Sequence, residues 1–113
     1  MGGRALPKPE WQFYCDRISK ALIGKRARIE VTGLKLGDQI AAKSLPLLGI
    51  TYDPKDDLLE VALEGLDHLI NKPRAISVDD GPEGLASMEI VDSDQMRQIV
   101  KLTEPLLLPV PRK

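Results

Sequence analysis

The feature that most constrains this chain is a series of short runs in which apolar and polar residues alternate, each run ended by turn-forming residues. In RARIEVTG, residues 26–33, Ala27, Ile29 and Val31 alternate with polar side chains, which is the pattern of a strand with one buried face. Similar runs follow at short intervals. The connections are too short for the helical crossovers that parallel strands need, so the pattern predicts antiparallel strands.

One segment ahead of these runs has a helical period instead. Residues 9–23, PEWQFYCDRISKALI, place apolar side chains three and four positions apart, at Trp11, Tyr14, Ile18 and Leu22. Pro9 suits the first turn of a helix, and Gly24 is a typical stop. The sequence therefore predicts an α+β fold in which this N-terminal helix packs on a curled antiparallel sheet or small barrel of five to six strands.

Further strands are expected between residues 45 and 102. Leu48, Ile50 and Tyr52 are predicted to share one face of a strand, and Leu59, Val61 and Leu63 one face of the next. Three later runs also alternate, namely AISV at 75–78, LASMEIV at 85–91 and MRQIVKL at 96–102. Residues 33–44 fit either a loop or a hairpin that contains a short strand.

The length and composition indicate one domain. A chain of 113 residues with 42% hydrophobic residues can bury a core without metal or disulfides. We predict a tail at residues 1–8, a single domain at 9–104 and a Pro/Leu-rich tail at 105–113. The single cysteine and the lack of any long apolar run favour a soluble, cytoplasmic protein that makes no membrane contact.

The most acidic stretch, DPKDD at residues 53–57, fits a metal loop, an acid/base site or a turn. A calcium loop needs alternate oxygen ligands and a glycine at the bend, whereas Pro54 and Lys55 interrupt the alternation. Asp53 can accept a hydrogen bond from the backbone two residues on, and Pro54 fixes the backbone for a turn. We therefore predict a hairpin turn here, with no metal and no cofactor.

His68 is the only histidine, so it is the natural centre for any acid/base chemistry. Its nearest carboxylates in the sequence are Asp67, Asp53 and Asp57. Asp67 is adjacent in sequence, near the end of a predicted strand, and neighbours on a strand point to opposite faces. Cys15, the one thiol, falls beside the apolar stripe of the helix, where a buried and inert cysteine is expected. These weak candidates, His68, Asp53 and Asp57, do not form a recognisable catalytic set.

A basic stretch runs from Lys20 through Lys25 and Arg26 to Arg28. Such a stretch can contact phosphates, and small β-barrels do bind nucleic acid. The net charge of −1 gives no long-range attraction to nucleic acid. The aromatic side chains needed to stack bases are also missing, because only Phe13 lies off the predicted core. Nucleic-acid binding is therefore the less favoured interpretation.

Residues 45–73, LPLLGITYDPKDDLLEVALEGLDHLINKP, resemble the core of a bacterial family of short proteins that carry a domain of unknown function. Trp11 and Phe13 in the helix, and Gly33, Gly37 and Gln39 after it, fit the same pattern. The resemblance extends over about residues 10–103 and implies no particular activity. It transfers no catalytic residue to this chain.

The sequence favours a non-enzymatic module that works through protein contacts, either with a second copy of itself or with another protein. The expected contact surfaces are an open sheet edge and the apolar tail that contains Leu106, Leu107 and Leu108. Two alternatives stay open. One is a small-molecule binder or modest enzyme centred on His68, and the other is a weak nucleic-acid binder that uses Lys20–Arg28.

Overall fold

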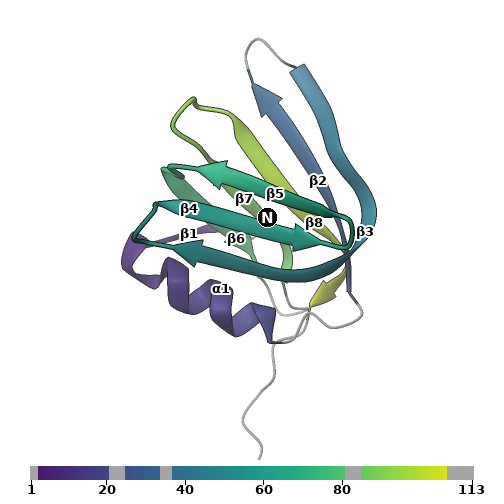
Figure 1. The fold of residues 1–113 in the computed structure, drawn as a ribbon, viewed down its shortest axis with the longest axis horizontal. Coiled ribbons are helices and arrows are strands. Elements are labelled where there is room, and N and C mark those ends of the chain that lie inside the picture. The colour runs from purple at the N-terminus through teal and green to yellow at the C-terminus, as the bar shows by residue number, and fades with distance from the viewer. Residues whose placement is uncertain (1–2, 21–24, 34–36, 81–84, 107–113) are drawn as a thin grey trace, which may run out of the picture.

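The computed structural model describes residues 3–20, 25–33, 37–80 and 85–106. These residues form one α-helix, preceded by a short 3-10 helix, and eight β-strands (Figure 1). The helices are η1 (Lys8–Glu10) and α1 (Trp11–Ser19). The strands are β1 (Gly3–Leu6), β2 (Arg26–Gly33), β3 (Gly37–Asp53), β4 (Leu58–Leu63), β5 (Leu66–Asn71), β6 (Ala75–Asp79), β7 (Leu85–Val91) and β8 (Arg97–Leu106).

All eight strands belong to one antiparallel sheet with the order β1-β6-β7-β8-β2-β3-β4-β5. The α+β class is confirmed, but the predicted number of five to six strands is too small. The small-barrel alternative is wrong, because β1 and β5 end the order and do not pair with each other. The two strands that the sequence did not predict are these two edges. Gly3–Leu6 was assigned to a tail, yet it pairs with β6.

The sheet curls because β3 changes partners along its length. Up to Pro46 it pairs with β2, and from Leu47 onward it pairs with β4. A register shift between Leu47 and Gly49 marks the change. Such a bulge moves the following side chains to the other face. Leu47 is therefore buried, whereas Leu48, predicted to share the face of Ile50 and Tyr52, is 63% exposed.

The helix covers an edge of β3 that β2 leaves unpaired. The Ser19 hydroxyl, at the end of α1, donates to the carbonyl oxygen of Ile50 at 2.7 Å and accepts from its amide at 2.9 Å. One side chain thus replaces the pair of hydrogen bonds that a neighbouring strand would supply. The helix is shorter than the predicted 9–23, because Lys8–Glu10 form η1. Leu22 and Gly24 lie outside the described residues.

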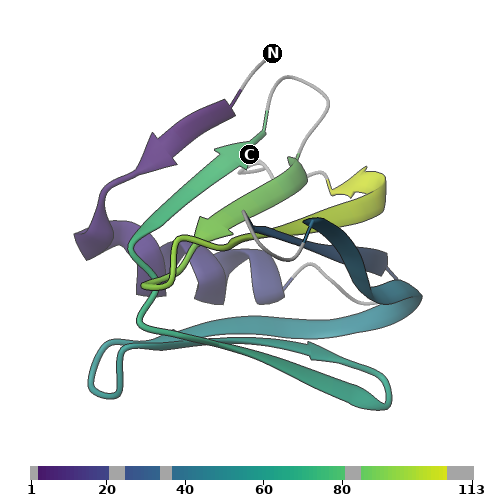
Figure 2. The same cartoon turned by 90° about the horizontal axis from the view of Figure 1, so that it is seen from above.

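The core lies inside the curl. Figure 2 shows the β4–β5 hairpin set apart from β6, β7 and β8, and in this view α1 lies between the two groups of strands. The inner face of β4 contributes Leu59, Val61 and Leu63, all buried as predicted, and α1 contributes Trp11 and Ile18. The rings of Trp11 and Tyr52 meet edge to face, with centroids 5.2 Å apart. This contact joins the helix to the bent strand.

The described parts of the chain contain no helix that is long and apolar enough to cross a membrane.

The Ser19 contact can be tested by the substitution Ser19→Ala. The loss of the hydroxyl leaves two half-buried main-chain groups of Ile50 without these partners, so we expect unfolding free energy to fall by about 1–2 kcal/mol. Urea denaturation followed by circular dichroism measures this loss. Ser77→Ala is the matched control, because Ser77 is a half-buried serine whose side chain makes no hydrogen bond within the described residues. Equal stabilities for the two variants would contradict the role of Ser19.

Candidate functional site

The acidic stretch forms the turn between β3 and β4, as predicted. Asp53 pairs with Leu58 across the hairpin. The Oδ1 atom of Asp53 accepts hydrogen bonds from the amides of Lys55 and Asp56, at 2.9 and 3.4 Å. Asp57 adopts a φ of +52°, a left-handed conformation that Asp tolerates in turns. The Asp53 side chain therefore stabilises the backbone of the turn.

A small pocket lies beside this turn, where η1 and the start of α1 approach the end of β3. It has a volume of about 310 Å³ and is lined by Lys8, Pro9, Gln12, Tyr52 and Pro54. The Lys8 ammonium lies 5.6 Å from the centroid of the Trp11 ring and 3.9 Å from Asp57 Oδ1. Both of these contacts are weak for an exposed lysine.

The hydroxyl of Tyr52 is already engaged at this pocket. It donates to Asp57 Oδ1 at 2.7 Å. Burial, followed by the hydrogen bond to Asp57 and the charge of that carboxylate, raises the pKa of Tyr52 to about 12. Tyr52 is therefore a neutral donor at physiological pH, and Asp57 is its acceptor.

His68 lies on the inner face of β5, opposite Val61 of β4. Its Nε2 atom forms a hydrogen bond with Gln98 Oε1 of β8, and Gln98 Nε2 donates to Asp92 Oδ2 at 2.8 Å. Asp92 also accepts hydrogen bonds from the amides of Asp94 and Met96 through Oδ1, at 2.9 and 3.0 Å. The side chains of Gln98 and Asp92 are buried. A polar chain thus connects the edge strand β5 to the β7–β8 turn through the inside of the sheet.

The three carboxylates proposed as partners of His68 lie elsewhere. Asp67 is exposed on the outer face and interacts with Glu60, whose pKa is raised chiefly by the nearby negative charge of Asp67. Asp53 and Asp57 make the turn contacts already described. The sequence did not indicate Gln98 or Asp92, because they are 30 and 24 residues away and lie on a turn and strand that only the fold brings near His68.

The direction of these hydrogen bonds determines the tautomer of His68. A carboxylate oxygen can only accept a hydrogen bond, so the Gln98 amide turns its nitrogen, the donor, toward Asp92. The oxygen of the same amide must then face His68. His68 consequently donates from Nε2. Its Nδ1 atom then carries the lone pair in the neutral ring and has no hydrogen-bond partner among the described residues. The imidazole has an orienting chain of the kind that positions a base.

The one thiol of the chain, Cys15, is not available as a nucleophile for that base. Cys15 is fully buried in α1, and burial raises the pKa of its thiol to about 12. A neutral, enclosed thiol is inert, as predicted. The described residues also contain no group of three or more His, Cys, Asp or Glu side chains arranged to hold a metal ion.

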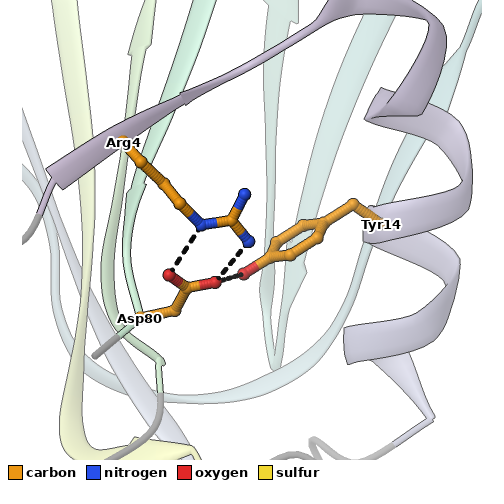
Figure 3. A network of polar contacts seen from close by, with 3 residues as sticks. All are labelled: Arg4, Tyr14 and Asp80. Atoms are coloured by element: carbon orange, nitrogen blue, oxygen red, sulfur yellow. Dashed lines mark hydrogen bonds and ion pairs between the residues drawn. The ribbon is translucent and has the colours of Figure 1, made fainter. Parts of the chain in front are cut away.

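A second polar cluster, which the sequence did not predict, joins β1, α1 and β6 (Figure 3). Arg4 donates two hydrogen bonds to Asp80, from Nε at 3.0 Å and from Nη2 at 2.8 Å, and the Tyr14 hydroxyl donates to Asp80 Oδ2 at 3.1 Å. These donors, the Arg4 guanidinium foremost, hold the pKa of Asp80 below its usual value. Arg4 and Asp80 are 76 residues apart, so no local pattern could reveal the pair.

The basic stretch is partly neutralised within the chain. Arg26 donates to the hydroxyl and the carbonyl oxygen of Ser44, at 3.0 and 2.7 Å. Arg28 lies 3.0 Å from Glu30, a carboxylate that also lies 3.5 Å from Lys101. The carboxylate of Glu30 therefore lies beside two of the basic side chains on β2 and β8, Arg28 and Lys101.

The comparison with known proteins agrees with the resemblance seen in the sequence. The model of a family of unknown function, DUF5335, matches residues 3–111. This chain belongs to that family. A protein of Aquifex aeolicus (strain VF5), described as uncharacterized, is 37% identical over 110 residues, which cover 96% of this chain and 99% of the relative. No solved structure matches the chain.

The Arg4–Asp80–Tyr14 cluster predicts a specific pH dependence of stability. The pKa of Asp80 in the folded chain lies below its ordinary value of 3.8. The ionised Asp80 therefore contributes fully to the free energy of unfolding above pH 3.8, and this contribution is lost as the pH falls through the folded pKa. Asp80→Asn should lower unfolding free energy by about 1 kcal/mol or less at pH 7, because Arg4 is 54% exposed. Urea denaturation at pH 7 and pH 3 measures this, and the difference between wild type and variant should narrow at pH 3. Asp16→Asn, on the exposed side of α1, is the control. A gap between wild type and Asp80→Asn that stays constant with pH would contradict the assignment.

The polar chain at His68 predicts a change of tautomer in Asp92→Asn. The oxygen of the new amide would still accept from the main-chain amides of Asp94 and Met96, so its nitrogen would face Gln98. Gln98 must then turn its oxygen toward residue 92 and its nitrogen toward His68. The imidazole would then accept at Nε2 and carry its proton on Nδ1. Nitrogen-15 NMR of the imidazole reports this change without ambiguity, because the chain has one histidine.

Asp94→Asn, on the exposed side of the same turn, is the control and should leave His68 unchanged. The Asp92 variant should also lose about 1–3 kcal/mol of stability, since the contacts of Asp92 are buried. An Nε2–H tautomer that persists in Asp92→Asn would show that Gln98 does not orient the ring.

Proposed function

We propose that this chain is a non-enzymatic module that works through protein contacts, and that the free edge of β5 is its contact surface. The observation that carries the proposal is the open sheet, in which β5 pairs, among the described residues, with β4 alone. An edge strand presents unpaired main-chain donors and acceptors to any strand of another chain. Addition of such a strand is a common mode of recognition.

The two edges of the sheet differ in how well they are protected. β1 has only four residues, and its one charged side chain, Arg4, is engaged with Asp80. Short length and charge are the usual protections of an edge. β5 has six residues, contains no proline and pairs with β4 without a register shift. On its outer face Leu69 is 51% exposed. β5 is therefore the edge better suited to accept a strand.

The polar side chains support a structural role over a catalytic one. Asp53 and Asp57 hold the β3–β4 turn, Asp80 joins three elements, and Asp92 orients Gln98. Each of these four carboxylates is thus a hydrogen-bond acceptor within the fold. His68 has an orienting chain, yet the one thiol of the chain, Cys15, is fully buried and unavailable to it.

The C-terminal tail is a second proposed contact segment. The tail was predicted from residue 105, but β8 continues to Leu106, which pairs with Leu85. Leu107 and Leu108 lie outside the described residues. A truncation designed to test the tail should therefore begin at residue 107, so that β8 stays intact.

The proposal predicts a mass that depends on concentration and on the β5 edge. Leu69→Lys places a charge on the edge and removes apolar contact area, so we expect association to weaken roughly tenfold, which corresponds to about 1.4 kcal/mol. Sedimentation equilibrium of the full chain at increasing concentration measures this. Deletion of residues 107–113 in the same series tests the tail, and we expect it to weaken association as well.

Leu48→Lys is the matched control, because Leu48 is 63% exposed and lies on β3, away from the edge. It introduces the same charge and should leave association unchanged. A Leu48 variant that weakens association as much as the Leu69 variant would overturn the assignment of the contact to β5. A wild-type chain that stays monomeric at every concentration would exclude contact between two copies of the chain.

A further inference from the structure

We infer that the partner of β5 is a second copy of this chain, and that the two β5 strands pair antiparallel about a two-fold axis at Leu69. This inference rests on the proposed function. Pairing of two β5 strands forms a closed dimer, because the β5 edge of each copy is then paired and cannot bind a third chain. Pairing of β5 with β1 of another copy would instead leave one edge free in every added chain.

The geometry of strands restricts the possible registers. For the inner faces of the two sheets to continue as one face, directly opposite residues must point to the same side. The axis must therefore pass through a residue that lies opposite its own copy. Near the middle of β5 the candidates are Asp67, His68, Leu69 and Ile70. An axis at Ile70 would leave Asp67 opposite residue 73, beyond the end of β5.

An axis at Asp67 is disfavoured by charge. It would place two carboxylates directly opposite each other, and like charges in that position destabilise a strand pair. The outer face already carries excess negative charge there, because Asp67 raises the pKa of Glu60 on β4. A second pair of the same carboxylates would add to this repulsion.

An axis at His68 has a different cost. It would put Asp67 opposite Leu69 of the other copy, so a carboxylate would lose solvent against an apolar side chain without gaining a partner. It would also bring two imidazoles together on the inner face, where His68 is already held by Gln98. In this register neither of the exposed side chains, Asp67 and Leu69, gains a suitable partner.

An axis at Leu69 gives each of the two exposed side chains, Asp67 and Leu69, a suitable partner. Leu69, 51% exposed in one copy, would lie against Leu69 of the other and bury the largest apolar side chain of the edge. Asp67 would lie opposite Asn71, whose amide nitrogen can donate to the carboxylate, and the two-fold axis repeats this contact. On the inner face, His68 would lie opposite Ile70, beside the existing core. Apolar and polar complementarity therefore select the same register.

Cysteine cross-linking in the full chain tests this register. Directly opposite residues of an antiparallel pair have Cα atoms about 4.5–5.5 Å apart, within the range of a disulfide. Leu69→Cys should thus give a cross-linked dimer under mild oxidation, as seen on a non-reducing gel. Native Cys15 is fully buried and does not compete. Leu48→Cys, an exposed position away from the edge, measures random collision.

A mixing experiment makes the test independent of the Leu69 variant itself. Asp67→Cys and Asn71→Cys remove side chains that are exposed in the single chain. In the proposed register residue 67 lies opposite residue 71, so neither variant should cross-link alone, whereas a mixture of the two should. Supporting results are cross-linking of Leu69→Cys well above the Leu48 control and a dimer formed only by the mixture.

The outcomes separate this inference from the proposed function. If the chain associates through β5 but Leu69→Cys links no better than Leu48→Cys, the register is wrong and the contact surface stands. Strong cross-linking of Asp67→Cys alone would move the axis to Asp67 and also overturn the register. A ladder of higher oligomers would replace the closed dimer with β5–β1 pairing. A strict monomer in sedimentation overturns this inference, because the partner of β5 would then have to be a different protein.

Discussion

The fold depends on the change of partners along β3. A strand has two edges, and the 17 residues of β3 use them differently in each half. Pro46, which has no N–H to donate, lies at the change. The neighbouring Leu47 amide donates to Lys25, and the Pro46 carbonyl accepts from Glu64 on the β4 side. The bend carries β4 and β5 over the rest of the sheet, so one sheet encloses the core from two sides with α1 along the third.

The polar groups of the interior follow from this enclosure. A curl brings side chains of the edge strand near strands that are far away in the sheet order, so polar groups there need partners across the gap. His68 of β5 finds Gln98 of β8, and Gln98 finds Asp92. Among the described residues no buried side-chain nitrogen or oxygen lacks a hydrogen-bond partner. The polar side chains that the sequence offers for chemistry are thus largely engaged in contacts within the fold.

Local patterns predicted what depends on local physics. The alternation in β2 and β4, the apolar stripe of α1 and the turn at Asp53 all follow from residues within a few positions of one another. Leu48 was misplaced because the bulge at Leu47 is set by the pairing of β3 with β4. The edge strands were missed because Gly3–Leu6 and Leu66–Asn71 become strands only through pairing with β6 and β4. The partners of His68 and Arg4 could not be predicted from local patterns, because they lie 30 and 76 residues away in the sequence.

The pairing of β1 with β6 has a consequence for the order in which the chain can fold during synthesis. The helix can begin to pack once β3 has emerged, since β3 is the strand that it chiefly contacts. The first strand must wait for Ala75–Asp79, because its partner lies there. Closing such a long loop is slow relative to forming a hairpin. The N-terminal segment should therefore remain undocked while most of the sheet assembles, and its arrival, secured by Arg4 and Asp80, should be among the last steps of folding.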